Sequence, residues 1–272
     1  HITQSAVSQR IKLLEEQVGQ ILLARTAPPR ATPPGQKILK HYLQVKRLEH
    51  DLRDEIHQPS DRPCTTITVG INADSLATWF MDAISPLLLA EKLVLDIRTD
   101  DQERTHQLLK DGAVVGCIST REKPLQGCRS APLGRMAYGL YATPAFVERW
   151  FPDGITPMAA RQAPAIIFNR KDALHSKLFQ RAFGEAPAAT PIPCHYIPSS
   201  EKFAEFIAMG LGYGMLPRQQ SDAYTQAGHL IDLLPEYKVP VDLYWQCWNL
   251  KSAVLEKLTR QLVSEANRLL EG

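Results

Sequence analysis

Residues 3–15 read Thr-Gln-Ser-Ala-Val-Ser-Gln-Arg-Ile-Lys-Leu-Leu-Glu, and this stretch indicates how the N-terminal part of the chain folds. Apolar side chains recur here with the spacing of one face of an α-helix, at Val7, Ile11, Leu14 and Val18. Thr3 is a residue type that caps helices, and Gly19 follows the last apolar position as a stop. The pattern therefore predicts a helix over residues 4–18.

The opposite face of this helix carries short or flexible polar side chains, at Gln4, Ser5, Ser8, Gln9 and Lys12. Side chains of this kind at the start of a helix suit the base edges in the major groove of DNA. The alternative is an ordinary solvated surface helix, which composition alone favours because polar faces are common.

A second helix is predicted from Thr32-Pro33-Pro34-Gly35 to about Gln58, after a short turn-forming segment that carries Arg25 and Arg30. Its apolar residues form one long stripe, at Ile38, Tyr42, Val45, Leu52 and Ile56. Few local apolar segments could cover this stripe, so we expect the same helix of a second subunit to do so. A polar, proline-containing linker follows at 59–63.

The charge of the chain is unevenly distributed. The 272 residues include 31 Lys and Arg against 29 Asp and Glu, yet residues 1–47 carry +6 and the remainder −4. Such asymmetry is typical of proteins that bind nucleic acid, although a basic segment is often only a solvated face.

No apolar run approaches the roughly 18–20 residues that a membrane-spanning helix needs. The five cysteines are scattered and form no Cys-x-x-Cys pair, which argues against zinc and disulfides and for a reducing cytoplasm.

From residue 65 onward, strand-like and helical segments alternate. The expected strands are 66–71, 93–98, 114–118, 139–141, 165–168, 195–198, 213–217 and 243–248. The expected helices begin near Leu76 or span 107–111, 176–183, 200–209 and 252–270. This alternation predicts an α/β fold with a parallel sheet, whose ligands bind beyond the carboxyl ends of the strands.

Three segments together, Thr3–Glu15, Leu22-Leu23-x-Arg25 and Thr32-Pro33-x-Gly35, resemble the winged helix-turn-helix of LysR-type transcriptional regulators. The resemblance implies a recognition helix at 4–18, a wing at 22–31 and a dimerising linker helix at 34–58. Family members carry another helix and a half before this point, so we expect an N-terminally truncated sequence with a partial winged helix-turn-helix.

The resemblance extends over the whole chain and implies three parts. They are a DNA-binding part with linker helix at 1–58, a hinge at 59–64 and a two-lobed effector domain, similar to periplasmic binding proteins, at 65–272. Lobe I is expected at 65–137 and 241–272, and lobe II at 138–240. The family also implies a cytoplasmic homodimer or homotetramer that binds double-stranded operator DNA and acts on RNA polymerase.

The resemblance narrows to a subfamily. The segments that agree with ArgP-type regulators are 25–30, Asn72–Trp79, Val114–Gly116, Ser199–Glu201 and Leu243–Trp245. These regulators respond to lysine or arginine and control genes of basic amino-acid export and metabolism.

The residues expected at the effector site fit a basic amino acid. An α-carboxylate favours free N–H groups at helix starts together with hydroxyls, which Ser75, Thr78, Ser199 and Ser200 would supply by opening one helix in each lobe. A cationic side chain favours carboxylates, and acids follow the first two expected strands at Asp74, Asp100, Asp101 and Glu103. The alternative is that each acid merely caps a helix, and Arg98 and Arg104 lie close by in the sequence.

The residues expected to contact DNA are of two kinds. Gln4, Ser5, Ser8 and Gln9 are assigned to base edges, Lys12, Arg25 and Arg30 to phosphates, and Thr3 to the start of the recognition helix.

No catalytic residue, metal site or cofactor is predicted. Cys194 and His195 are neighbours in an expected strand and point to opposite faces, and no helix carries His-x-x-x-His. The rival is a cytoplasmic amino-acid-binding module or small enzyme on the same two lobes, which leaves residues 1–58 unexplained.

Overall fold

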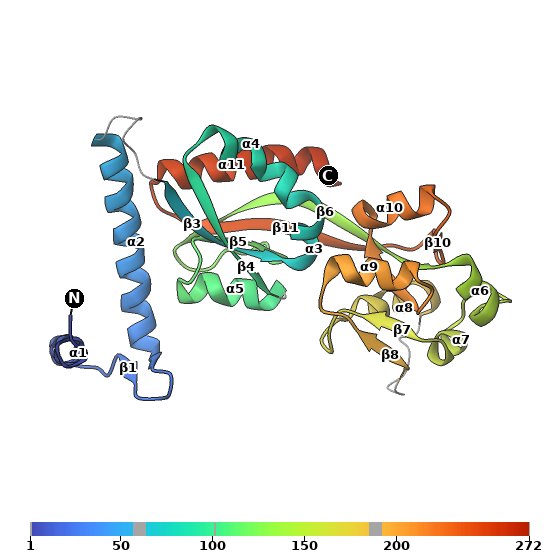
Figure 1. Cartoon of the computed structure of the whole chain (residues 1–272), viewed down its shortest axis with the longest axis horizontal. Coiled ribbons are helices and arrows are strands. Elements are labelled where there is room, and N and C mark those ends of the chain that lie inside the picture. Colours follow the sequence, from blue (N-terminus) through green and yellow to red (C-terminus); the bar gives the residue numbers. More distant parts are fainter. Residues whose placement is uncertain (1, 57–63, 101, 185–191, 272) are drawn as a thin grey trace.

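The computed structural model describes residues 2–56, 64–100, 102–184 and 192–271. An N-terminal arm stands at one end of the molecule, and two α/β lobes extend away from it (Figure 1).

The arm begins with α1 (Gln4–Val18), as the sequence predicts. The Ala6 amide donates to Thr3 Oγ1 at 3.3 Å, and Gly19 ends the helix at φ 71°. Strands β1 (Leu23–Ala24) and β2 (Arg30–Ala31) then pair antiparallel as a small wing. The Glu15 carboxylate accepts from the Leu22 amide at 2.7 Å, which fixes the wing to the end of α1.

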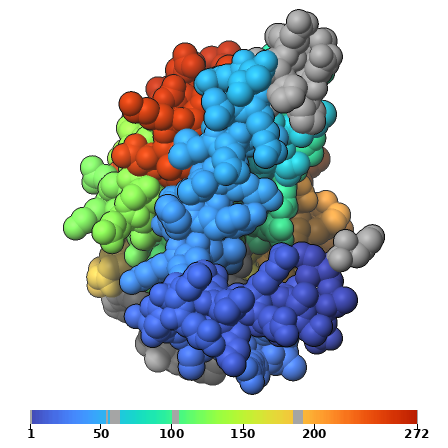
Figure 2. Space-filling model, turned by 90° about the vertical axis from the view of Figure 1, so that its left-hand side faces the viewer, coloured from blue at the N-terminus to red at the C-terminus, as the bar shows by residue number. Residues whose placement is uncertain are grey.

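The arm ends in α2 (Pro33–Ile56), which confirms the second predicted helix over the described residues. Thr32 Oγ1 accepts from the Gly35 amide at 3.3 Å and caps its start. One side of α2 packs against the body of the protein, where Leu43 joins a cluster with Val114 and Trp248. The other side remains exposed (Figure 2), and its apolar side chains, Tyr42, Val45, Leu52 and Ile56, are between 38% and 74% exposed.

Lobe I is built from three strands and their helices. The strands are β3 (Thr65–Asn72), β4 (Leu93–Asp100) and β5 (Gly116–Ser119). The helices are α3 (Ala73–Ser75), a π-helical turn (Leu76–Phe80), α4 (Met81–Ala90), α5 (Gln102–Asp111) and α11 (Ala253–Leu269). Helices α4 and α11 cover one face of the sheet and α5 the other (Figure 1).

Lobe II has the same layered character. Its strands are β7 (Ala165–Ile167), β8 (Cys194–Tyr196), β9 (Tyr213–Pro217) and β10 (Ile231–Asp232). Its helices are α6 (Pro144–Trp150), α7 (Pro157–Gln162), α8 (Leu174–Phe183), α9 (Ser200–Ala208) and α10 (Arg218–Gln226).

The expectation of a parallel sheet was only partly correct. Two long strands, β6 (Cys128–Ala142) and β11 (Val239–Trp248), pair antiparallel and join the lobes in one mixed sheet of order β4-β3-β5-β11-β6-β9-β7-β8. The β3–β4 and β7–β8 pairs are parallel. The sequence indicates only the end of β6, at 139–141, because Arg129, Ser130 and Arg135 interrupt its apolar pattern.

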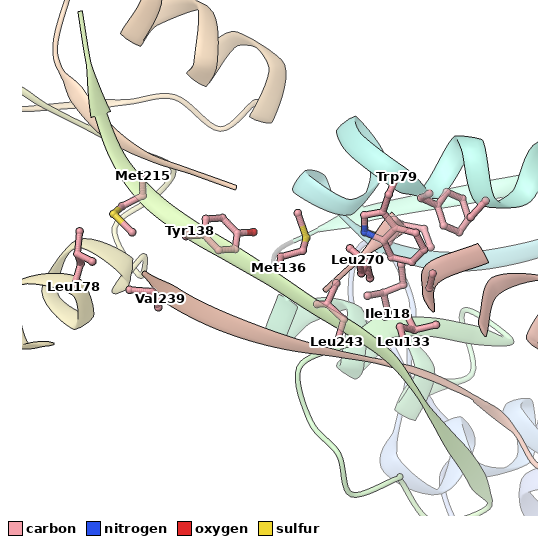
Figure 3. Close-up of a cluster of buried hydrophobic side chains, with 14 of the residues drawn as sticks. Trp79, Ile118, Leu133, Met136, Tyr138, Leu178, Met215, Val239, Leu243 and Leu270 are labelled. Carbon is pink, nitrogen blue, oxygen red and sulfur yellow. The ribbon is translucent and has the colours of Figure 1, made fainter. Parts of the chain in front are cut away.

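The main hydrophobic core follows these two strands from one lobe to the other (Figure 3). Met136, Tyr138 and Leu243 lie along β6 and β11, with Trp79 at the lobe I end and Met215 at the lobe II end. Burial of this continuous apolar surface supplies most of the stability and ties the two lobes together. Within the described ranges, the structure contains no helix that is long and apolar enough to cross a membrane.

His175 in α8 makes the stability of lobe II depend on pH. Its ring is buried, lies edge-on to Tyr213 at 5.7 Å between centroids, and has no hydrogen-bond partner among the described residues. Burial lowers the pKa of His175 to about 4, although the Asp172 charge acts in the opposite direction. The unfolded state then binds the proton more readily, so stability is complete above about pH 6.5 and decreases as the pH falls toward 4.

We therefore expect the free energy of unfolding to be about 2 kcal/mol lower at pH 5 than at pH 7 through His175 alone. Urea unfolding at the two pH values measures this difference. The His175→Phe variant should lose most of it, whereas His195→Phe, at an exposed position, should keep it. An unchanged pH dependence in His175→Phe would refute the assignment.

Candidate functional site

Asp74 lies where the two lobes meet. It follows β3 directly, in the first turn of α3, and its Oδ2 accepts a 2.7 Å hydrogen bond from the hydroxyl of Tyr138 on β6. Burial raises the pKa of the Asp74 carboxyl, while hydrogen bonds from Tyr138 and Ser200 lower it. One carboxylate therefore connects lobe I, the crossing strand and the start of α9 in lobe II.

Ser200 is the lobe II counterpart of Asp74. It is the first residue of α9, is buried, and its hydroxyl receives a 2.9 Å hydrogen bond from the Gln220 side-chain amide on α10. The neighbouring Ser199 caps α9, because its Oγ accepts from the Lys202 amide at 3.4 Å. The structure therefore brings Asp74 and Ser200 together, while the Ser199 hydroxyl is engaged within its own helix.

Ser75 and Thr78 do not open a helix, contrary to the expectation from the sequence. The helix begins at Ala73, not near Leu76, because no Gly or Pro interrupts the chain after Asn72, which occupies the cap position. Ser75 is fully buried, and its Oγ lies 4.0 Å from the sulfur of Met136. The Thr78 hydroxyl donates to the Asp74 carbonyl at 2.6 Å, so it is engaged inside the helix.

The acids expected after the second strand are only partly placed. Asp100 is the last residue of β4, and its backbone pairs in register with Asn72 at the end of β3. Glu103 belongs to the first turn of α5, and the side chains of both acids lie outside the described atoms. Asp101 lies outside the described residues.

Two residues near Asp74, Asp172 and Asn72, were not predicted from the sequence as site residues. Asp172 lies between β7 and α8 in lobe II, and its carboxylate accepts from the Leu174 amide at 2.9 Å. Its negative charge helps to raise the pKa of Asp74. Asn72 is buried, and its side-chain oxygen has no partner among the described residues. Asp172 follows a parallel strand in lobe II much as Asp74 does in lobe I, which is the signal that could have identified it.

This arrangement offers negative charge and hydrogen-bond acceptors from both lobes. Asp172 of lobe II is close enough to Asp74 for its charge to raise the pKa of Asp74, and the buried side-chain oxygen of Asn72 is an acceptor without a partner among the described residues. Beside them, α9 starts with backbone N–H groups that favour a negatively charged group. A ligand with cationic groups at one end and a carboxylate at the other matches this set.

The residues assigned to DNA are all exposed on the arm. Gln4, Ser5, Ser8, Gln9 and Lys12 lie on α1, Arg25 follows β1 and Arg30 lies in β2. Thr3, beside them, is engaged as the helix cap, and its hydroxyl also lies 3.0 Å from that of Ser5. The arm therefore presents two exposed arginines on the wing and an exposed polar face at the start of α1, residue types suited to phosphates and to base edges in a major groove.

In the parts of the chain that the structure describes, no group of three His, Cys, Asp or Glu side chains is placed to hold a metal ion. The five cysteines are free, and Cys194 and His195 occupy consecutive positions of β8.

Comparison with known proteins relates both halves of the chain to one family. Residues 1–36 match the bacterial regulatory helix-turn-helix proteins of the LysR family, and residues 60–266 match the LysR substrate binding domain. The transcriptional regulator ArgP of Aeromonas salmonicida is 41% identical over 271 residues, which cover all of this chain and 90% of that protein.

Solved structures of LysR-type regulators resemble the fold of this chain over its whole length. The crystal structure of ArgP from Mycobacterium tuberculosis has a TM-score of 0.90 at 38% identity, covering all of this chain and 91% of that one. The full-length regulator LysG from Corynebacterium glutamicum with bound effector Arg has a TM-score of 0.82 at 32% identity, with the same coverage.

The relatives are transcriptional regulators, so the prediction that this chain is not an enzyme is confirmed. The match at residues 1–36 also explains the arm, which a stand-alone amino-acid-binding module would not contain. The chain belongs to the LysR family of bacterial helix-turn-helix regulatory proteins.

Proposed function

We propose that this protein is a DNA-binding transcriptional regulator that responds to arginine or lysine and controls genes of basic amino-acid export and metabolism. The observation that carries the proposal is the contact of Asp74 in lobe I with Tyr138 and Ser200, which places a carboxylate between the lobes. The likeness to LysG with bound Arg supports arginine as one effector.

The proposed binding mode uses both lobes. The cationic groups of the amino acid contact Asp74 and Asp172, because paired carboxylates stabilise a guanidinium or ammonium by charge-assisted hydrogen bonds. The α-carboxylate lies toward the start of α9, where backbone N–H groups and the Ser200 hydroxyl are available. Asp100, Asp101 and Glu103 remain proposed contributors on the lobe I side. A ligand held this way bridges the lobes and favours one relative orientation of them.

Calorimetry with matched ligands tests the proposal. Arginine and its uncharged isostere citrulline differ in the charge of the side chain, as do lysine and norleucine. We expect each basic amino acid to bind at least about tenfold more tightly than its neutral partner, since a charge-assisted hydrogen bond contributes about 1.5–3 kcal/mol. Equal affinities within both pairs would refute the role of the carboxylates.

The arm contacts DNA through two kinds of residue, and substitutions of the two kinds should have different effects on binding. Arg30→Ala removes a phosphate contact, so we expect weaker binding to every DNA sequence and a log–log salt slope reduced by about 1. Gln4→Ala removes a base-edge contact, so we expect mainly a loss of specificity, by about 1–3 kcal/mol at one base pair. Fluorescence anisotropy on operator and random DNA at several salt concentrations, with protein expressed from its complete gene, measures both.

The two variants serve as controls for each other. If Arg30→Ala changed specificity, or if Gln4→Ala weakened operator and random DNA equally, the assignment of base and phosphate contacts would be wrong.

The domain boundaries follow from the same proposal. Residues 1–58 form the DNA-binding arm, 59–64 the hinge and 65–272 the effector domain, with lobe I at 65–137 and 241–272 and lobe II at 138–240. The regulator assembles as a homodimer or homotetramer through α2 and acts together with RNA polymerase. Because it acts on the bacterial chromosome, we place it in the cytoplasm.

A further inference from the structure

Helix α10 brings a further polar side chain to the start of α9. Gln220 is half-buried, and its side-chain amide donates to the Ser200 hydroxyl at 2.9 Å and to the Ser200 carbonyl at 3.4 Å. A carbonyl oxygen only accepts hydrogen bonds, so the NH₂ group of Gln220, and not its oxygen, must face Ser200. The two contacts therefore fix both the position of the Gln220 amide and its role as a donor.

The backbone that carries Gln220 is held by contacts with both lobes. Strand β9 of lobe II runs directly into α10, and Ser221, the residue after Gln220, is fully buried. At the start of α10, Arg218 forms an ion pair with Glu271, which follows α11 of lobe I, at 3.3 Å. Gln220 therefore reaches Ser200 from a helix that is anchored in lobe II and paired with lobe I.

The donor role of Gln220 decides where the hydroxyl hydrogen of Ser200 goes. A hydroxyl group has one hydrogen to donate, and its oxygen can accept. Because Ser200 Oγ accepts from Gln220, its hydrogen is left for another acceptor, and the Asp74 carboxylate is hydrogen-bonded to Ser200. Asp74 also accepts from the Tyr138 hydroxyl at 2.7 Å. Gln220, Ser200 and Asp74 thus form a chain of hydrogen bonds that runs toward the carboxylate, and bonds in such a chain strengthen one another.

We propose that Gln220 is a positioning residue of the effector site: it holds the Ser200 oxygen so that the hydroxyl hydrogen points to Asp74 in the ligand-free protein and to the α-carboxylate of a bound amino acid. The first part concerns the protein alone, and the second rests on the proposed function. When the cationic groups of the effector bind Asp74, the Ser200 hydrogen becomes available to the carboxylate, while Gln220 keeps the oxygen in place. A donor that is already oriented reduces the cost of ordering the site around the ligand.

The ionisation of Asp74 in the ligand-free protein tests the first part. In the full chain labelled with ¹³C at the carboxyl carbon of aspartate, the Asp74 signal is assigned by its absence in Asp74→Asn, and its pH titration gives the pKa. Gln220→Met keeps the approximate size of the side chain and removes the donor, so the Ser200 hydroxyl is no longer held toward Asp74. We expect the pKa of Asp74 to rise, because its ionised form loses part of a hydrogen bond.

Ser200→Ala shows whether this effect passes through the Ser200 hydroxyl. Tyr138 and Asp172 also act on the pKa of Asp74, and they are unchanged in all of these variants. We expect Gln220→Met to leave the pKa of Asp74 unchanged in the Ser200→Ala background. No rise in Gln220→Met alone, or an equal rise with and without the Ser200 hydroxyl, would show that Gln220 does not position Ser200.

Arginine binding tests the second part. Calorimetry of the full chain should show about threefold to tenfold weaker binding in Gln220→Met, the size expected for one neutral hydrogen bond. The same substitution should cause no further loss in the Ser200→Ala background. Gln226→Met, at an exposed position of α10, is the matched control and should bind like the parent protein.

The proposal is overturned if Gln220→Met binds arginine as tightly as Gln226→Met does. It is also overturned if Gln220→Met weakens binding equally in the Ser200→Ala background, as a purely structural role of Gln220 would require. A parent protein that bound basic amino acids no more tightly than neutral ones would contradict the proposed function. The titration of Asp74 needs no ligand, so it would still decide whether Gln220 positions Ser200.

Discussion

Replacing Asp74 by Asn is expected to weaken arginine binding by about 30-fold to several thousand-fold. The loss of one partner from a buried, hydrogen-bonded charge pair costs about 2–5 kcal/mol. The variant should fold normally, because the Asn side-chain oxygen still accepts the hydrogen bond from Tyr138. Calorimetry of the full chain with arginine measures the change. Asp82→Asn, the same substitution at an exposed position of α4, is the matched control and should bind like the parent protein.

The same carboxylate predicts a pH dependence of effector binding. Burial raises the pKa of Asp74, and a bound cation favours its ionised form, so binding at low pH must release a proton from Asp74. We expect affinity to decrease as the pH falls through this raised pKa and the dependence to disappear in Asp74→Asn. If Asp74→Asn bound arginine as tightly as Asp82→Asn does, the effector would not contact this carboxylate.

The double substitution Val45→Asp and Leu52→Asp is expected to weaken self-association by at least about 100-fold. Both side chains lie on the exposed apolar face of α2, at 38% and 57% exposure. Because both positions are exposed in the monomer, the variant should fold. In a subunit interface, however, each aspartate would be a buried, unpaired charge, which costs about 3–5 kcal/mol of association free energy. Size-exclusion chromatography coupled to light scattering measures the oligomeric state. Fluorescence anisotropy should show a parallel loss of affinity for operator DNA, because each DNA-binding arm then binds its half-site alone.

Gln44→Asp is the matched control for this variant. It introduces one aspartate, where the double variant introduces two, at the position next to Val45 and outside the apolar stripe. We expect it to keep the oligomeric state of the parent protein. Retention of the oligomer in the double variant would show that subunits associate through another surface.

The elements that the sequence predicts well are those held by interactions within about four residues. Helix α1 has the bounds expected from its apolar spacing, and both Thr3 and Gly19 act as its caps. Thr32 likewise caps α2, and four residues of the expected apolar stripe are exposed, whereas Ile38 is half-buried. Spacing, caps and helix-breaking residues act locally, so they can be recognised in the chain itself.

The site was predicted less completely, because its geometry depends on where distant segments meet. Asp74 and Ser200 were both expected at helix starts after strands, and the structure brings them together across the lobes. Ser75 and Thr78 were expected beside them, yet the helix begins three residues earlier, so the Thr78 hydroxyl donates to the Asp74 carbonyl and the buried Ser75 hydroxyl lies against the sulfur of Met136. Tyr138, which holds Asp74 from 64 positions further along the chain, carries no local signal of this role.

The amino-acid sequence by itself determined the DNA-binding arm, the alternation of strands and helices, and the family. Only the tertiary structure decided that β6 and β11 run antiparallel across both lobes and that Asp74 meets Ser200. The physical reason is the range of the interactions. Helix periods and caps involve neighbours in the chain, whereas strand pairing and the burial of a carboxylate depend on contacts that form only when remote segments pack.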